Sequence, residues 1–258
     1  MSLEVKNLSL KIGTKKLLSD INFKLGSNEV VAILGPNGAG KSTLFKVLSG
    51  EHRHYEGQVI LEGKDLKSWK ASDVAKLLGV LPQSSALAFP FSVSEVINLG
   101  RLPHSTGRVL DHQLITEAMS KADVSHLADA LYPSLSGGEK QRVQLARVLT
   151  QIWQKNDLGE RYLLLDEPTS ALDLPHQHQT LSLARDLAKE GVGVLAILHD
   201  LNLAAQYADR IILLSEGLCV AQGDVKTVLT PQQIESLYGI KVTVMSHPEH
   251  HYPLVVAS

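Results

Sequence analysis

The stretch Gly35-Pro36-Asn37-Gly38-Ala39-Gly40-Lys41-Ser42-Thr43 decides the fold. It follows the apolar run 30–34 and precedes the helical stretch 43–48, so it joins a buried strand to a helix. The spacing G-x-x-x-x-G-K-[ST] allows backbone N–H groups to surround a di- or triphosphate, because the glycines permit the tight turn. Lys41 and the helix N-terminus add positive charge, and the Ser42 hydroxyl can ligate magnesium. The stretch therefore predicts a phosphate-binding loop rather than a glycine-rich turn that binds nothing.

A second chemical pattern lies at 162–167, where four apolar residues are followed by Asp166 and Glu167. A buried strand would present Asp166 at its carboxyl end, where the carboxylate can hold the water shell of Mg²⁺. Glu167, one residue further, can polarise an attacking water. Many strands end in acidic residues, so this pattern has little value alone. Combined with the phosphate-binding loop, it predicts hydrolysis of a nucleotide phosphate.

The composition limits the class of protein. The chain has 258 residues and a formal net charge of −2, which disfavours broad, non-specific binding to nucleic acid. Cys219 is the only cysteine, so an internal disulfide is excluded. Residues 1–6 lack an apolar signal core, and the longest apolar stretches, such as 193–198, are too short to span a bilayer. We therefore expect any link to a membrane to come through a partner.

The order of the predicted elements indicates an α/β fold. Short alternating runs predict β structure over the first sixty residues, and near-continuous apolar runs predict buried strands further on. Loop and helix patterns predict a helical subdomain at about 84–157, inserted into the α/β core. We expect a C-terminal tail of uncertain order at 230–258. Strands are expected at 3–5, 8–12, 21–25, 30–34, 58–61, 162–165 and 192–198, helices at 94–99, 112–122, 126–130 and 139–153, a loop at 84–90, a helix between Pro175 and Gly191, and a hairpin at 210–214 and 218–222.

A third motif, Leu135-Ser136-Gly137-Gly138-Glu139-Lys140-Gln141-Arg142, lies between the first two. It opens a predicted helix whose exposed backbone donors suit a second phosphate contact, although a helix-capping turn is the alternative. With this motif the chain resembles ATP-binding cassette (ABC) ATPase subunits over nearly its full length. The resemblance implies a P-loop ATPase with a RecA-like core, an N-terminal antiparallel β subdomain and an inserted helical subdomain, within one cassette domain over 1–258.

The resemblance also implies the ligands, ATP and Mg²⁺, and the residues that hold them. ATP would bind at residues 35–43, and Ser42 and Asp166 would organise the metal. Gln83 would reach the metal or the attacking water. Glu167 would activate that water, and His199 would contact the γ-phosphate. From the residues alone, Gln83 is an ordinary loop residue and His199 is a polar group at a strand end.

A head-to-tail homodimer is implied in the same way. Each ATP would lie between the phosphate-binding loop of one subunit and Ser136, Gly137 and Gly138 of the other. The loop from Ser170 to Asp173 would touch the opposite subunit. This arrangement gives the third motif a phosphate that a monomer does not offer it.

Two positions depart from the pattern of the family. Glu139 stands where glutamine is frequent, and we expect little effect because Ser136 and the two glycines make the phosphate contact. Ile12, before Gly13, stands where an aromatic ring usually stacks on adenine. Adenine stacking should therefore be weaker, or another residue supplies it.

The stretches 167–178 and 199–210 resemble bacterial importers of iron chelates, cobalamin and haem. The resemblance implies haemin as cargo, with ferric siderophore or cobalamin as alternatives. The implied partners are two membrane-spanning permease subunits, docked near residues 83–91 and the helical insertion, and a periplasmic binding protein. The subunit would lie at the cytoplasmic face of the inner membrane and bind no nucleic acid.

Two other classes of protein compete with this interpretation. One is a soluble ABC ATPase that acts on nucleic acid or ribosomes, which the single cassette, the missing coiled-coil insertion and the near-neutral charge disfavour. The other is a regulatory module without turnover, which the intact pair Asp166 and Glu167 opposes. His247, His250 and His251 could be iron ligands, but a solvated tail explains them more simply, and Pro248 prevents a helical pair.

Overall fold

The computed structural model describes residues 2–83, 87 and 89–257. Its first layer is an antiparallel sheet with the strand order β2-β1-β4-β5. The strands are β1 (Ser2–Ile12), β2 (Lys15–Gly26), β4 (Glu56–Leu61) and β5 (Lys64–Asp65). Alternate residues of β1 are buried, as expected for a sheet with one face against the core.

The strand β1 is continuous, whereas the sequence predicted separate strands at 3–5 and 8–12. The polar residues between them stay in the strand because Asn7 adopts a positive φ of 50° within a register shift. Its backbone N–H donates to Asn22 Oδ1 at 2.7 Å and its side chain donates to Asp20 Oδ1 at 3.1 Å. A bulge therefore absorbs the turn-forming residues without ending the strand.

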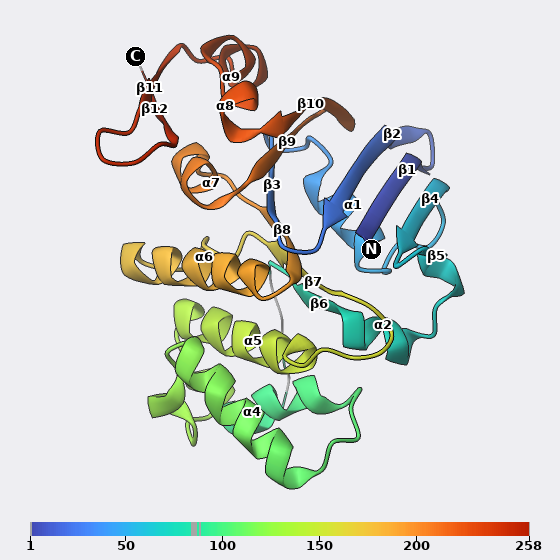
Figure 1. Cartoon of the computed structure of the whole chain (residues 1–258), viewed down its shortest axis with the longest axis vertical. Coiled ribbons are helices and arrows are strands. Elements are labelled where there is room, and N and C mark those ends of the chain that lie inside the picture. Colours follow the sequence, from blue (N-terminus) through green and yellow to red (C-terminus); the bar gives the residue numbers. More distant parts are fainter. Residues whose placement is uncertain (1, 84–86, 88, 258) are drawn as a thin grey trace.

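The second layer is a six-stranded sheet in the order β10-β9-β3-β8-β7-β6 (Figure 1). Its members are β3 (Val30–Leu34), β6 (Leu78–Leu81), β7 (Arg161–Asp166), β8 (Val192–Ile197), β9 (Arg210–Ser215) and β10 (Leu218–Asp224). The strands β9, β3, β8, β7 and β6 are parallel, and β10 pairs antiparallel with β9 as the predicted hairpin. Strands that are buried on both faces consist of continuous apolar residues, and for this reason the sequence predicted β3, β7 and β8 with nearly correct bounds.

Each face of this sheet belongs to a separate core. Val31 and Ile33 of β3 pack with the antiparallel sheet and α1 (Lys41–Leu48). Val30 and Ala32 face the other way, toward α5 (Gly137–Ile152), α6 (Leu174–Lys189) and α7 (Leu201–Tyr207). The phosphate-binding loop, at the end of β3, thus follows the central strand of a sheet that is covered on both sides.

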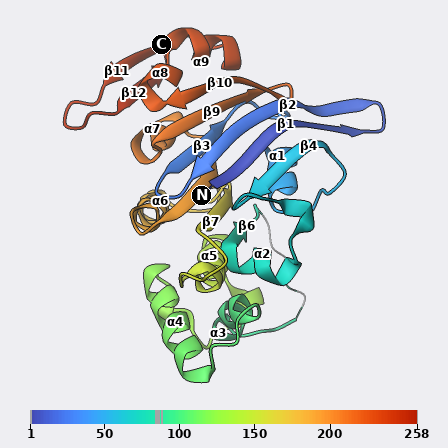
Figure 2. The same cartoon turned by 45° about the vertical axis from the view of Figure 1, so that its right-hand side comes forward.

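The helical part of the chain lies along the side of α5 that faces away from the antiparallel sheet (Figures 1 and 2). It contains α3 (Val93–Asn98) and α4 (Arg108–Lys121), which both pack on α5, while α2 (Ala71–Leu77) directly precedes β6 in the chain and also packs on α5. The helix predicted at 126–130 is wrong. Only the 3-10 turn η3 (Ser125–Leu127) forms there, because Val93 and Ser94 donate their backbone N–H groups to the carbonyls of Ala130 and Ala128. The predicted loop 84–90 lies partly outside the described residues.

The C-terminal segment holds four short elements: α8 (Val225–Val228), α9 (Pro231–Tyr238), β11 (Val242–Ser246) and β12 (Pro253–Ala257). The strands β11 and β12 form an antiparallel hairpin. Asn202 of α7 fastens this hairpin, since its side chain donates to Val255 O at 3.1 Å and accepts from the Val255 N–H at 2.7 Å. Across the described part of the chain, no helix combines the length and the apolar character that crossing a bilayer requires.

Candidate functional site

The parallel strands bring the predicted motifs to one edge of the sheet. Carboxyl ends of parallel strands meet at the same edge, and ligands of open α/β sheets bind there. The phosphate-binding loop follows β3, Asp166 is the last residue of β7 and Glu167 comes directly after it, His199 follows β8, and Gln83 follows β6. Residues far apart in the sequence are therefore neighbours in the fold.

The conformation of the phosphate-binding loop requires glycine at Gly35. A Cβ atom added there would lie 2.2 Å from the backbone oxygen of Leu214 in β9. The loop is also held from the β9–β10 turn, where the Gly217 N–H donates to Ala39 O at 2.9 Å. In turn, the Ser19 N–H donates to Gly217 O at 2.8 Å, so β2, the β9–β10 turn and the loop are linked in series.

Lys41 lies folded back on the loop. Its Nζ donates to Gly35 O at 2.7 Å and to Pro36 O at 2.9 Å, and the residue is only 6% exposed. Burial lowers the pKa of Lys41, while the nearby charges of Glu167 and Asp166 act in the opposite direction. The ammonium is thus held among carbonyls and carboxylates, with a position suited to a polyphosphate.

A cleft of about 440 Å³ opens beside the loop. Three backbone segments line it besides Glu167: the loop itself, the start of β2, and the β9–β10 turn. Its lining residues are Lys15, Lys16, Leu17, Asn37, Gly38, Ala39, Gly40, Lys41, Ser42, Thr43, Glu167, Glu216 and Gly217. The sequence motifs do not include Lys15, Lys16, Leu17, Glu216 and Gly217, because these residues reach the cleft only through the pairing of strands.

Ile12 is not among the residues that line the described cleft, and 56% of it is exposed. It pairs with Lys15 at the β1–β2 turn, so it lies next to the lining without joining it. Its expected place beside adenine therefore stays a prediction.

Glu167 is contacted by two of the other predicted site residues. Gln83 Nε2 donates to Glu167 Oε2 at 2.7 Å, and His199 Nε2 lies 2.6 Å from Glu167 Oε1. The backbone of Glu167 adopts a positive φ of 51°, in the region that side chains rarely occupy. Strain of this kind persists only when the surroundings fix it, and it concentrates at functional sites.

Asp166 is 7% exposed, and its Oδ1 is buried without a hydrogen-bond partner in the described part of the chain. Burial, followed by the adjacent charge of Glu167, raises the pKa of the Asp166 carboxyl to about 6. An unpaired carboxylate oxygen of this type is costly unless a cation or water satisfies it. The donor chemistry of Asp166, Ser42 and Gln83 (carboxylate, hydroxyl and amide oxygen) fits a hard cation such as Mg²⁺.

The third motif forms a helix-capping turn. Ser136 is the N-cap of α5, and Glu139 closes a capping box, since the Ser136 N–H donates to Glu139 Oε2 at 2.7 Å. The serine hydroxyl donates to the same oxygen at 2.6 Å, and these hydrogen bonds lower the pKa of Glu139. Glu139 thus has a structural role as the residue that closes the cap of α5. None of Ser136, Gly137 and Gly138 lines the described cleft.

The segment after Glu167 leads to Asp173, the N-cap of α6. Asp173 Oδ1 accepts from the His176 N–H at 3.2 Å and lies 2.5 Å from His176 Nδ1. The other ring nitrogen of His176 lies 3.4 Å from Asp123 Oδ2, beyond the end of α4. Asp173, like the third motif, does not line the described cleft.

The C-terminal histidines lie in the β11–β12 hairpin, not in the cleft. His247 stacks on His250 with ring centroids 4.8 Å apart, and its backbone N–H donates to Tyr252 O at 3.0 Å. Among the described residues, no group of three or more His, Cys, Asp or Glu side chains is placed to hold a metal ion.

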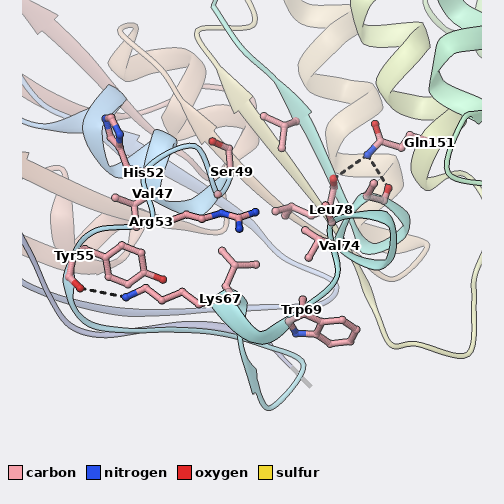
Figure 3. Close-up of a pocket in the computed structure, with 15 residues that line it drawn as sticks. Val47, Ser49, His52, Arg53, Tyr55, Lys67, Trp69, Val74, Leu78 and Gln151 are labelled. Atoms are coloured by element: carbon pink, nitrogen blue, oxygen red, sulfur yellow. Dashed lines mark hydrogen bonds between the residues drawn. The ribbon is translucent and has the colours of Figure 1, made fainter.

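A second cavity of about 230 Å³ lies at the C-terminal end of α1, whereas the cleft borders the N-terminal end of that helix (Figure 3). Apolar residues from α1, α2 and β6 form much of its wall, with Trp69 beside them. His52, Arg53 and Lys67 are its basic residues, and no acidic residue is among the described residues that line it. Lys67 Nζ lies 3.6 Å from the centre of the Tyr55 ring and donates to Tyr55 O at 3.2 Å.

Comparison with known proteins places this geometry among transport ATPases. A family model described as "ABC transporter" matches residues 18–170. The hemin import ATP-binding protein HmuV of Gloeobacter violaceus is 52% identical over 256 residues, covering 98% of this chain and 93% of that protein. The protein of the same name from Pseudomonas aeruginosa is 50% identical, covering 99% of each.

A solved structure agrees with these relatives. A chain from an ABC transporter of the metal-chelate type, in an inward-facing conformation, superposes with a TM-score of 0.81 and 28% identity. The superposition covers 100% of this chain and 97% of the other. The predicted P-loop α/β fold is confirmed by this likeness.

Proposed function

The chain belongs to the ABC transporter family, and from that premise we propose that it is the ATP-hydrolysing subunit of a bacterial importer of haemin. The observation that carries the cargo is the identity of about half of all residues with hemin import ATP-binding proteins, over nearly full length on both sides. Ferric siderophore and cobalamin remain the alternative cargoes. The same similarity speaks against a soluble ATPase acting on nucleic acid or ribosomes.

We propose that ATP binds in the cleft beside residues 35–43. The loop amides and Lys41 would hold the β- and γ-phosphates, since hydrogen bonds to Gly35 O and Pro36 O already keep the Lys41 ammonium beside the loop. Mg²⁺ would be held by Ser42, Gln83 and Asp166, and when bound it would neutralise charge on the phosphate oxygens. The unpaired Asp166 Oδ1 supports this assignment.

Hydrolysis requires a base beside the γ-phosphate. The Glu167 carboxylate would take a proton from a water molecule, whose oxygen attacks the γ-phosphorus while the bond to ADP breaks. Gln83 and His199 hold the two carboxylate oxygens and so orient the base. In the presence of ATP, His199 would also contact the γ-phosphate and Gln83 would sense it.

A second copy of the chain would complete each ATP site. Ser136 to Gly138 form an N-terminal turn with backbone donors, yet this turn does not line the described cleft of its own subunit. A head-to-tail dimer would bring it, and the loop ending at Asp173, to the cleft of the partner. Closure would then need two ATP molecules, and hydrolysis would reopen the dimer.

We infer that the second cavity receives a cytoplasmic helical segment of the membrane-spanning subunit. Apolar walls and three basic residues without an acidic counterpart among the described lining residues favour a segment that carries both apolar and acidic side chains. Gln151 of α5 joins the wall and donates to Ala75 O at 2.7 Å, so both parts of the cassette border the cavity (Figure 3). The region 83–91, predicted for this contact, lies partly outside the described residues.

The full assembly would contain two copies of this chain, two permease subunits and a periplasmic binding protein. The chain would then lie peripherally at the cytoplasmic face of the inner membrane. The decisive experiment reconstitutes the chain with its genetically neighbouring permease in vesicles. ATP-driven uptake of haemin is expected to exceed that of ferric siderophore and cobalamin. Uptake that prefers one of the other two would refute the haemin assignment while keeping the ATPase role.

A further inference from the structure

Gln141 connects the third motif to the catalytic segment of the same subunit. It lies one turn into α5, five residues after the N-cap Ser136. Its side-chain Nε2 donates to the backbone oxygen of Glu167 at 3.0 Å. Its Oε1 accepts from the backbone N–H of Ala171 at 3.4 Å. One amide therefore holds both ends of the turn 167–171.

The backbone oxygen of Glu167 accepts several of the hydrogen bonds that hold this turn. Besides Gln141, it accepts from the Ser170 N–H at 3.2 Å and from Ser170 Oγ at 3.1 Å. The residue adopts φ 51°, a left-handed conformation that is unfavourable for an L-residue. Because the strain must be held by the surroundings, contacts to this carbonyl decide where the carboxylate of Glu167 points.

The third motif and this turn also pack directly. A Cβ atom added at Gly138 would lie 3.0 Å from the backbone oxygen of Ala171. A larger residue at this position would therefore require the turn to move. Gln141 itself is not among the residues that line the described cleft. Within its own subunit, it can therefore act on hydrolysis only through the residues that it holds.

We propose that Gln141 is a positioning residue that transmits the state of the third motif to the general base of its own subunit. In the head-to-tail dimer, Ser136 to Gly138 contact the ATP of the partner site. The start of α5 then becomes fixed, and Gln141 fixes the Glu167 peptide in the other site. ATP in one site thereby prepares the base of the second. This inference rests on the proposed roles of Glu167 and of the dimer.

The test compares three variants of the full-length chain by steady-state ATP hydrolysis. Gln141→Met removes both hydrogen bonds at similar volume. Gln141→Glu removes the donor to Glu167 but keeps an acceptor for Ala171. Lys140→Met is the matched control, because Lys140 lies in the same turn and its Nζ donates to Pro133 O, at 3.0 Å, rather than to the segment 167–171.

Both Gln141 variants are expected to lower kcat about tenfold or more, since small displacements of a catalytic group have effects on the order of 10²-fold. The KM for ATP should stay within about twofold of the unmodified chain, because no nucleotide contact is lost. Lys140→Met should leave both parameters unchanged. If Gln141→Met does not fold, Gln141→Glu gives the same comparison.

A second measurement separates positioning from a defect in the third motif. Glu167→Gln alone should form an ATP-dependent dimer in gel filtration, and adding Gln141→Met should not abolish that dimer. A kcat within twofold of the unmodified chain, or loss of the dimer in the double variant, overturns the role of Gln141. Normal hydrolysis by Glu167→Gln would instead overturn the proposed role of Glu167.

Discussion

Gly217, in the turn between β9 and β10, should affect both the stability of the fold and the binding of ATP. Its φ is +77°, and a Cβ atom added there would lie 2.5 Å from Leu17 O. Gly13 is the matched control, because its φ is +59° and no atom lies within 4 Å of an added Cβ. An alanine at either position meets the left-handed conformation, but only the one at Gly217 also meets a backbone atom.

The conformational cost of alanine is about 1–2 kcal/mol at both positions. Overpacking adds about 1–3 kcal/mol at Gly217, because Leu17 O must move or the turn must open. The free energy of unfolding, measured with urea, should therefore be about 1–3 kcal/mol lower for Gly217→Ala than for Gly13→Ala. For a domain of this size the difference corresponds to a Tm lower by about 2–4 °C per kcal/mol.

Gly217→Ala should also weaken the binding of ATP. The Gly217 N–H holds Ala39 O within the phosphate-binding loop, and Leu17 lines the cleft. If the strain weakens the binding of ATP to the loop by about 1.4 kcal/mol, the apparent KM for ATP rises about tenfold. Gly13→Ala should leave this KM unchanged. Equal unfolding free energies for the two variants, together with an unchanged KM, would refute the view that the turn supports the loop.

Four further outcomes are expected. Glu167→Gln should keep ATP binding and lower kcat by about 10²–10⁴-fold, measured by phosphate release; near-normal turnover would remove Glu167 from the mechanism. Mixing Lys41→Ala with Ser136→Arg should give dimers with one intact composite site, detectable by nucleotide trapping; its absence would contradict the head-to-tail arrangement. Ile12→Tyr should lower the KM for ATP with little change in kcat, the pattern of added uniform binding; an unchanged KM would mean that Ile12 does not face adenine. Arg53→Glu should weaken co-purification with the permease but spare the ATPase activity of the isolated chain; unchanged co-purification would exclude the second cavity as the docking surface.

The sequence predicts those parts of the site whose chemistry needs adjacent residues. A phosphate-binding loop works only with its glycines, lysine and serine in fixed spacing, so the order of residues 35–43 along the chain is enough to identify it. Buried parallel strands are apolar throughout, which revealed β3, β7 and β8 and hence the edge where the motifs meet.

Other residues reach the site only through tertiary structure. Lys15, Lys16 and Gly217 line the cleft because two strand turns fold over the loop, and no local pattern specifies that. Gln141 was visible within the third motif, but its partners, Glu167 and Ala171, lie 26 and 30 residues away. The wrong helix at 126–130 has the same origin, because backbone pairing with residues 93 and 94 overrides local helical preference.

The C-terminal hairpin has a practical consequence for anyone who attaches a purification tag or a reporter protein. Asn202, which fastens β12, is the second residue of α7, and the N-cap of that helix, Asp200, follows His199 directly. A bulky fusion that pulls the hairpin away would leave the Asn202 side chain without both of its bonds to Val255 and loosen the start of α7. A lower ATPase activity in such a fusion would then be caused by a change at Val255, some fifty residues after His199 in the chain.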